Sequence, residues 1–427
     1  MGYSRIKKAD IGDKLQYLVR DFNDNTIRFV VRYPGRVASD ILRVATKTVV
    51  DSVDILHASF VANDSDAYWE VHDDYEEKDY FQIIETKEDA LEAADTYALM
   101  SLQPKDKTKL RCYLVRGNKE NVIVILISHL CVDGIDGKYL FGKVIEAYND
   151  ILEKGTAKGV AIKDGKRDAM QIYDNISKKD YRFLMKNPIS KIKSEFPYPT
   201  KEAGKPHLVK VNIPTETMKK VIGRLDLKEI TLNDLLITSC YYAYASMPNK
   251  NPGEPMSILS MIDLRRHCTG RDSEGISNMT GALPTTLPIG LRESFGITLD
   301  KIAAQTKAIK DNPLAGLEGM PILHGAAKNL PMKLLLPLAS KVYDSFSIGL
   351  TNLGNMANDF LSLGGMNPDF GLFGGPMNKK PGMQVSAVSI GGSCTLCIVV
   401  ECTDSDAEIL QIMLERMAGE VGSYTLF

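Results

Sequence analysis

Blocks of apolar residues divide the first part of the chain into short strands and one amphipathic helix. Apolar runs bounded by polar or turn residues predict strands at 27–33, 55–61, 68–71, 110–115 and 121–128. The last two runs flank a loop that contains Gly117 and Asn118, which predicts a hairpin. Between Ser39 and Asp51 apolar residues recur at helical spacing, so this segment is predicted to be a helix.

The same patterns return after residue 206. Strands are predicted at 207–213, 256–263, 345–350, 385–390 and 395–401. Helices are predicted at 234–245, 295–309 and 405–420. Thr231 lies just before the first of these helices and is its expected N-terminal cap.

A polar, lysine-rich connector separates the two halves. Residues 166–205 contain prolines at 188, 197 and 199, and their lysines are typical of a solvated linker, with a binding patch as the alternative. We therefore expect an N-terminal lobe at 1–165 and a C-terminal lobe at 206–427. Strands outnumber helices in each half, so the predicted fold class is α/β with two mixed-sheet lobes.

Composition and charge narrow the function classes. The chain has 427 residues, of which 44% are hydrophobic and 25% charged, as in an ordinary globular protein. Its formal net charge of −2 argues against a nucleic-acid surface. No apolar run approaches the roughly 18 residues of a membrane span, and the N-terminus lacks the apolar core of a signal peptide.

Seven cysteines lie in apolar segments, which fits a reduced cytoplasm better than a disulfide scaffold. Cys394 and Cys397 form a CxxC pair, but residues three apart in a strand face opposite sides of the sheet. We therefore expect structural cysteines, no metal site and a cytoplasmic location.

The most specific motif follows the apolar run at 122–127. His129, Asp133 and Gly134 form the pattern HxxxDG, which this composition would produce by chance about 0.06 times. Asp136 is the expected N-terminal cap of the helix that follows. A histidine on such a turn is typical of a general base, and the alternative is a buried structural histidine before an ordinary turn.

Two weaker motifs lie in the C-terminal half. Arg265, in Asp263-Leu264-Arg265-Arg266, can hold a carboxylate such as Asp133 in a bidentate pair, and the alternative is a polar surface loop. Residues 369–376 read DFGLFGGP and are predicted to form a glycine-rich turn. This segment lacks the spacing of a phosphate loop and the other motifs of a protein kinase.

Together these motifs resemble the chloramphenicol acetyltransferase-like superfamily. This superfamily includes peptide-synthetase condensation domains, alcohol acetyltransferases and the plant BAHD acyltransferases. The resemblance implies two αβ lobes with a tunnel between them. It also implies that His129 is the general base and that Asp133 is a structural residue paired with Arg265. Gly134 would leave room for the substrate. Two departures are Ser128, where condensation domains usually have a second histidine, and DFGLFG in place of the BAHD sequence DFGWG.

These residue types predict acyl transfer from a thioester. A neutral imidazole can take a proton from an alcohol or amine, which then attacks the thioester carbonyl. Asn352, Thr351 or backbone N–H groups near residues 352–354 are the candidate donors to the oxyanion. Cys131 lies within the variable part of the motif, so we expect it to pack in the core and not to carry an acyl group.

The expected cosubstrate is an acyl-CoA or a phosphopantetheine thioester, and no bound cofactor is expected. The acceptor is expected to be a small molecule, and an acyl carrier protein is a candidate partner. One alternative is a non-catalytic protein of this fold that binds a carrier protein. Another is a free-standing condensation enzyme, which Ser128 disfavours. His267 is expected on a solvent-facing loop. Lys379 and Lys380 are candidates for docking a carrier or the phosphates of CoA, and residues 330–338 for an apolar pocket or for core packing.

Overall fold

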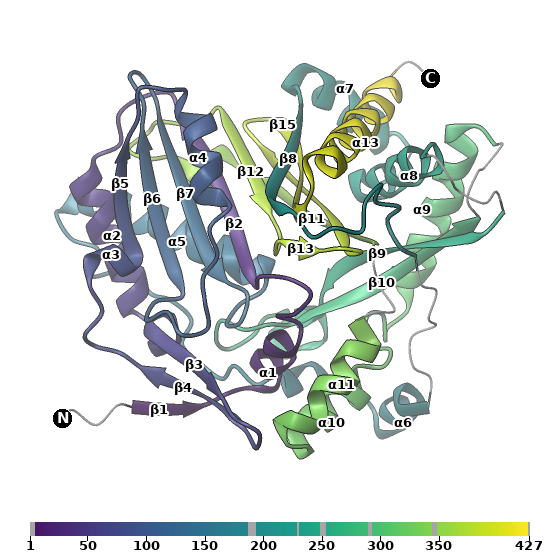
Figure 1. The fold of residues 1–427 in the computed structure, drawn as a ribbon, viewed down its shortest axis with the longest axis horizontal. Coiled ribbons are helices and arrows are strands. Elements are labelled where there is room, and N and C mark those ends of the chain that lie inside the picture. The colour runs from purple at the N-terminus through teal and green to yellow at the C-terminus, as the bar shows by residue number, and fades with distance from the viewer. Residues whose placement is uncertain are drawn as a thin grey trace.

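The computed structural model describes residues 5–186, 194–228, 230–247, 253–288, 293–343 and 348–425. Its strands form three sheets, and the larger two belong to two lobes that lie side by side (Figure 1). The N-terminal lobe holds a five-stranded sheet in the order β12-β2-β7-β6-β5. The C-terminal lobe holds a seven-stranded sheet in the order β10-β9-β11-β14-β15-β13, in which β8 also pairs with β15. The predicted fold class is therefore confirmed.

The centre of the N-terminal sheet is the antiparallel pair β2 and β7. Strand β6 pairs with the other side of β7, and β5 pairs with β6. Their bounds are Thr26–Tyr33, Asn121–Ser128, Leu110–Arg116 and Phe81–Glu85. All eight residues of β7 are buried, because helices cover both faces of the sheet. Helices α2 (Ser39–Asp51) and α5 (Gly134–Lys154) cover one face, and α4 (Ala90–Ala98) covers the other. A strand buried on both faces has a continuous apolar sequence, as the run at 122–127 has.

A small three-stranded sheet lies beside this lobe. It is formed by β1 (Arg5–Lys8), β4 (Ala67–Val71) and β3 (Ala58–Ala62). The prediction of a strand at 55–61 is partly wrong, since Asp54–His57 form a 3₁₀ helix before β3 begins. The predicted hairpin of β6 and β7 across Gly117 is confirmed.

The strands of the C-terminal lobe are β8 (Lys205–Ile213), β9 (Pro255–Asp263), β10 (Thr280–Pro288), β11 (Ile348–Met356), β13 (Asn378–Lys379), β14 (Met383–Ile390) and β15 (Ser393–Cys402). Its helices include α7 (Thr215–Asp226), α8 (Leu232–Ala245), α9 (Phe295–Asp311) and α13 (Asp404–Ser423). The Thr231 cap of α8 is confirmed, and Asp234 completes a capping box with it. The first residues of the strand predicted at 345–350 lie outside the described residues.

The predicted glycine-rich turn at 369–376 is wrong, because β12 (Phe370–Gly374) is a strand. It pairs antiparallel with β2 and so adds a segment from the C-terminal half to the N-terminal sheet. Its glycines permit this close approach: a Cβ on Gly371 would lie 2.3 Å from Ile390 Cδ1, and one on Gly374 would lie 3.0 Å from Val399 Cγ2. The glycines therefore allow β12 to pack against β14 and β15 while it pairs with β2.

Shorter helices complete the described fold. They are α1 (Ile11–Leu18), α3 (Glu77–Tyr80), α6 (Lys178–Lys186), α10 (Met320–Asn329), α11 (Met332–Tyr343) and α12 (Asn358–Leu361). In the described part of the chain, no helix has both the length and the apolar character needed to cross a membrane. Among the same residues, no group of three or more histidine, cysteine, aspartate or glutamate side chains could hold a metal ion.

Candidate active site

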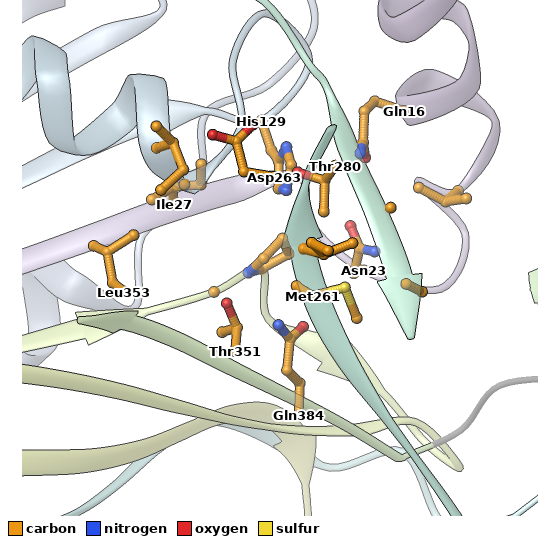
Figure 2. Close-up of a pocket in the computed structure, with 18 of the residues that line it drawn as sticks. Gln16, Asn23, Ile27, His129, Met261, Asp263, Thr280, Thr351, Leu353 and Gln384 are labelled. Atoms are coloured by element: carbon orange, nitrogen blue, oxygen red, sulfur yellow. The ribbon is translucent and has the colours of Figure 1, made fainter. Parts of the chain in front are cut away.

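His129 directly follows the last residue of β7, at the end of the sheet that faces the C-terminal lobe. Its N–H donates to the Asn25 carbonyl at 2.7 Å, which fixes the chain as it leaves the strand. Its ring lines a cavity between the lobes (Figure 2). Burial lowers the pKa of His129 below its ordinary value, and the nearby Asp133 carboxylate offsets this only in part. The imidazole is therefore neutral at neutral pH.

Asn278 determines which nitrogen of His129 carries the proton. The Asn278 side-chain NH₂ donates to the carbonyls of His129, at 2.8 Å, and Leu130, at 3.3 Å. Its Oδ1 consequently faces His129 Nδ1, at 3.0 Å. Because an amide oxygen only accepts, Nδ1 of the neutral ring must be protonated, and Nε2 keeps the free lone pair. Nε2 is the nitrogen that can act as a base.

Asp133 is fully engaged in holding the turn and does not contact the His129 ring. It is the N-terminal cap of α5, and its Oδ1 accepts from the N–H groups of Ile135 and Asp136, each at 3.1 Å. Its Oδ2 accepts from Met279 N–H and from Arg265, each at 2.8 Å. Burial disfavours the ionised carboxyl, but Arg265 lowers the pKa of Asp133 below its ordinary value. Asp133 is thus an ionised structural anchor.

Arg265 joins this turn to the C-terminal lobe through a guanidinium that is almost fully buried. Its Nη2 donates to Asp136 Oδ2 at 2.6 Å, and its Nη1 also donates to Asp263 Oδ1 at 2.9 Å. With Nε on Ser273 and a further bond from Nη2 to the Ser277 carbonyl, all five of its donors are used. A guanidinium offers five donors in a fixed planar fork, so it holds both carboxylates in a defined geometry that the single ammonium of a lysine does not provide.

The predicted role of Asp136 is wrong. The cap of α5 is Asp133, and the helix begins at Gly134, three residues earlier than expected. Asp136 lies inside the first turn and is the second buried carboxylate on Arg265. Lys163, from the end of the predicted N-terminal lobe, lies 2.9 Å from its Oδ1.

The cavity has a volume of about 570 Å³, within the usual range for ligand sites. Both lobes contribute to its wall, which is largely apolar, and Figure 2 shows His129 near Asp263 and Thr280, with Thr351 and Gln384 below them. The apolar part of the wall includes Leu15, Met261, Ala282, Met320, Leu353 and Phe373. Among the described residues that line the cavity, Asp263 and His129 are the only ones with ionisable side chains.

The cavity opens where two parallel strands separate. Strands β9 and β11 pair only at Gly349–Leu259 and Leu350–Ser260. Beyond this point Thr351 and Asn352 line the cavity on β11. The Asn352 side-chain oxygen accepts from the N–H of Gly354 at 2.9 Å, which leaves its NH₂ group to donate. These residues therefore share the cavity with His129.

Gly134 also lines the cavity, at the first turn of α5. A Cβ at this position would lie 3.4 Å from Leu353 Cδ1 and 3.5 Å from Phe373 Cζ. These are close van der Waals contacts with two other lining residues, so a larger side chain would occupy cavity space.

The cysteines and three other residues named in the sequence analysis lie away from the cavity or are already engaged in the fold. All seven cysteines are free and buried, as predicted, and burial raises the pKa of the Cys131 thiol to about 12. His267 is buried, not solvent-facing, and its Nε2 lies 3.0 Å from the Ala315 carbonyl. Lys380 is a poor docking residue, because its ammonium is buried against Asp406 at 2.8 Å. Met332, in the predicted pocket segment, packs in the core.

Sequence reasoning missed Asn278 and Arg167. Asn278 lies on the segment before β10, 149 residues from His129, and carries no motif of its own. Arg167 lies at the start of the predicted connector, and its guanidinium donates to the Cys131 carbonyl at 3.0 Å and to Asp13 at 2.6 Å. A local sequence signal could not have identified either residue, because both act through long-range contacts.

This chain is similar to known proteins in its fold. No protein-family model and no curated protein matches this sequence. Solved structures match over nearly the whole chain. The first condensation domain of the CDA synthetase is 12% identical and superposes with a TM-score of 0.70, over 99% of this chain and 97% of that one. Polyketide synthase associated protein 5 from Mycobacterium tuberculosis is 13% identical, with a TM-score of 0.67 over 98% of each chain.

The trichothecene 15-O-acetyltransferase TRI3 from Fusarium sporotrichioides is 11% identical, with a TM-score of 0.67 over 97% of this chain and 95% of that one. At these identities the similarity concerns the fold, which is the one that the motifs at 129–134 and 263–266 indicate. The chain has the two-lobed chloramphenicol acetyltransferase-like fold that condensation domains and this acetyltransferase share.

Proposed function

We propose that the protein transfers an acyl group from a thioester to an alcohol or amine, with His129 as the general base. The observation that carries this proposal is the hydrogen bond between Asn278 Oδ1 and His129 Nδ1. It leaves the basic Nε2 lone pair on a neutral ring that lines a cavity between two lobes. A merely structural histidine would not need an open cavity beside it.

The reaction needs one proton acceptor and no covalent intermediate. His129 Nε2 takes the proton from the acceptor O–H or N–H as its heteroatom attacks the thioester carbonyl. The carbon–sulfur bond of the tetrahedral intermediate then breaks, and the imidazolium returns the proton to the departing thiolate. The products are an ester or amide and a free thiol. Cys131 takes no part, because a thiol with a pKa of about 12 is not ionised at neutral pH.

Two further features support this assignment. Thr351 and Asn352 line the cavity and offer a hydroxyl and an amide NH₂ to the oxyanion of the intermediate. Asp133 holds the turn and contributes negative charge near the ring, which stabilises the imidazolium formed during the reaction.

The test is thiol release and product formation with acyl-CoA donors of several lengths, acyl carrier proteins, and mixed alcohol and amine acceptors. We expect His129→Ala to lower kcat by about 10²- to 10⁴-fold. A matched control is His72→Ala, since His72 lies outside the cavity and is expected to leave kcat unchanged. Equal activity in His129→Ala would refute the general base. Tight carrier binding by a wild type that transfers no acyl group would favour a non-catalytic carrier-binding role.

A further inference from the structure

Helices α6, α10 and α11 lie together at one end of the molecule, opposite α7 (Figure 1). Helix α10 contacts both α6 and α11. Each helix buries part of its surface, with Leu184 of α6, His324 of α10 and Leu335 of α11 packed inside the protein. Other side chains on each helix are exposed. We call the exposed residues of 178–186 and 320–337 the α6–α11 surface.

The α6–α11 surface exposes large apolar side chains. Met185 of α6, Leu330 after α10 and Leu334 of α11 have exposed fractions of 44%, 40% and 54%. Ile322 and Leu336 are exposed as well. A group of exposed apolar side chains with charged residues around it is typical of a site that contacts another protein or a membrane.

The same surface carries a concentration of positive charge. Its described cations are Lys178, Lys179, Arg182, Lys186, Lys328 and Lys333, and each is exposed. Those at 178, 182 and 186 are four residues apart, so they form one row along α6. Within the described part of the chain, none of the six forms an ion pair. Like charges at this spacing repel each other, and an anionic partner would relieve the repulsion.

Acidic residues on this surface are few. Asp180 is the only acidic residue in the sequence of the three helices, and its carboxylate accepts from the Ser177 hydroxyl at 2.6 Å. Asp64 lies at the border, where its carbonyl accepts from the Lys333 N–H at 3.2 Å. The whole chain has a formal net charge of −2, so the positive charge here is a local feature. It is complementary to an anionic surface.

We propose that the α6–α11 surface docks the protein on an anionic lipid bilayer. The lysines and Arg182 contact the headgroups, while Met185, Leu330 and Leu334 enter the apolar boundary below them. This combination of basic and apolar side chains is the one that holds interfacial helices on membranes. A bilayer offers both kinds of contact at once to side chains that come from three separate helices. The inference does not depend on the proposed acyl transfer, because it concerns where the protein binds.

Helix α10 connects this surface to the cavity. Met320 and Leu323 line the cavity from α10, whereas Ile322 of the same helix is exposed. A protein docked through the α6–α11 surface therefore holds the cavity close to the bilayer.

The experiment measures binding of the full chain to lipid vesicles by flotation. One set of vesicles is phosphatidylcholine alone, and the other contains about one-third phosphatidylserine. We expect at least about tenfold tighter binding to the anionic vesicles, because each basic residue near such a surface contributes about fivefold to the affinity. Binding should weaken as salt rises from about 0.1 to about 0.5 M, since salt screens the attraction.

Two variants with matched controls locate the surface. The triple variant K178A/R182A/K186A should bind anionic vesicles about 10²-fold more weakly. Its control is K219A/K220A/K228A, which removes the same charge from exposed positions in and after α7 at the other end of the molecule.

The apolar contribution is tested by Leu334→Ser, which should weaken binding about tenfold. Its control is Leu227→Ser, since Leu227 follows α7 and is 86% exposed. Both controls should bind as the wild type does. All four variants change exposed side chains, so circular dichroism should be the same as for the wild type.

Equal binding to neutral and anionic vesicles, or no binding to either, would overturn the inference. So would a loss of affinity in the α7 controls as large as that in the α6 and α11 variants, because net charge alone would then explain the binding. Capture of an acidic protein through Arg182 and Leu334 without vesicle binding would replace the bilayer by a protein partner.

Discussion

Replacement of Arg265 by alanine should strongly destabilise the protein. The guanidinium lies 2.8 Å from Asp133 and 2.6 Å from Asp136, and the three side chains have exposed fractions of 2%, 1% and 0%. The variant would leave two carboxylates buried without their common partner. Loss of one partner of a buried ion pair costs about 3–5 kcal/mol. Because Lys163 still lies 2.9 Å from Asp136, we expect the free energy of unfolding to fall by about 4 kcal/mol.

The assay is urea unfolding followed by circular dichroism, and the neighbouring Arg266 provides a matched control. Arg266 is exposed, and its guanidinium donates to the Lys310 carbonyl at 3.0 Å, so Arg266→Ala should change stability by less than about 0.5 kcal/mol. Arg265→Lys should lie between the two, because an ammonium cannot reproduce the planar fork. A loss below about 1 kcal/mol in Arg265→Ala would show that the buried cluster does not hold the lobes together.

Four other outcomes follow from the site. Asn278→Ala should lower kcat about 10- to 100-fold, because Nδ1 of His129 loses its acceptor and its orientation; unchanged kcat would contradict the tautomer assignment. Because burial lowers the pKa of His129 and the neutral ring is the base, kcat/KM should stay constant down to below pH 6.5 and fall only at lower pH; an acid limb above pH 7 would contradict this. Gly134→Leu should raise KM at least tenfold while circular dichroism stays unchanged, because the side chain enters the cavity beside Phe373. Cys131→Ala should retain kcat, and iodoacetamide should not inactivate the wild type, since that thiol is buried and protonated.

Local sequence patterns predicted elements in which the residues themselves determine which faces are buried. The continuous apolar run of β7 and the helical spacing of α2 each depend on burial of the residues themselves, and both elements appear at the expected positions. The pattern failed where conformation depends on a distant neighbour. Phe370–Gly374 has the glycines of a turn but becomes a strand, because β2 supplies the pairing partner 338 residues or more away in sequence.

The residues of the candidate site also fall into those that the sequence identified and those that only the tertiary structure identified. The motif by itself identified His129 and Asp133, and a planar, permanently charged side chain in Asp263-Leu264-Arg265-Arg266 was sufficient to suggest the partner of Asp133. The roles of Asn278 and Asp136 are decided by tertiary structure, since one sets the histidine tautomer across 149 residues and the other shares Arg265. Local patterns determine which residues are buried and which side chains can do chemistry, whereas only packing of the two lobes decides how those side chains are oriented, because their partners come from distant parts of the chain.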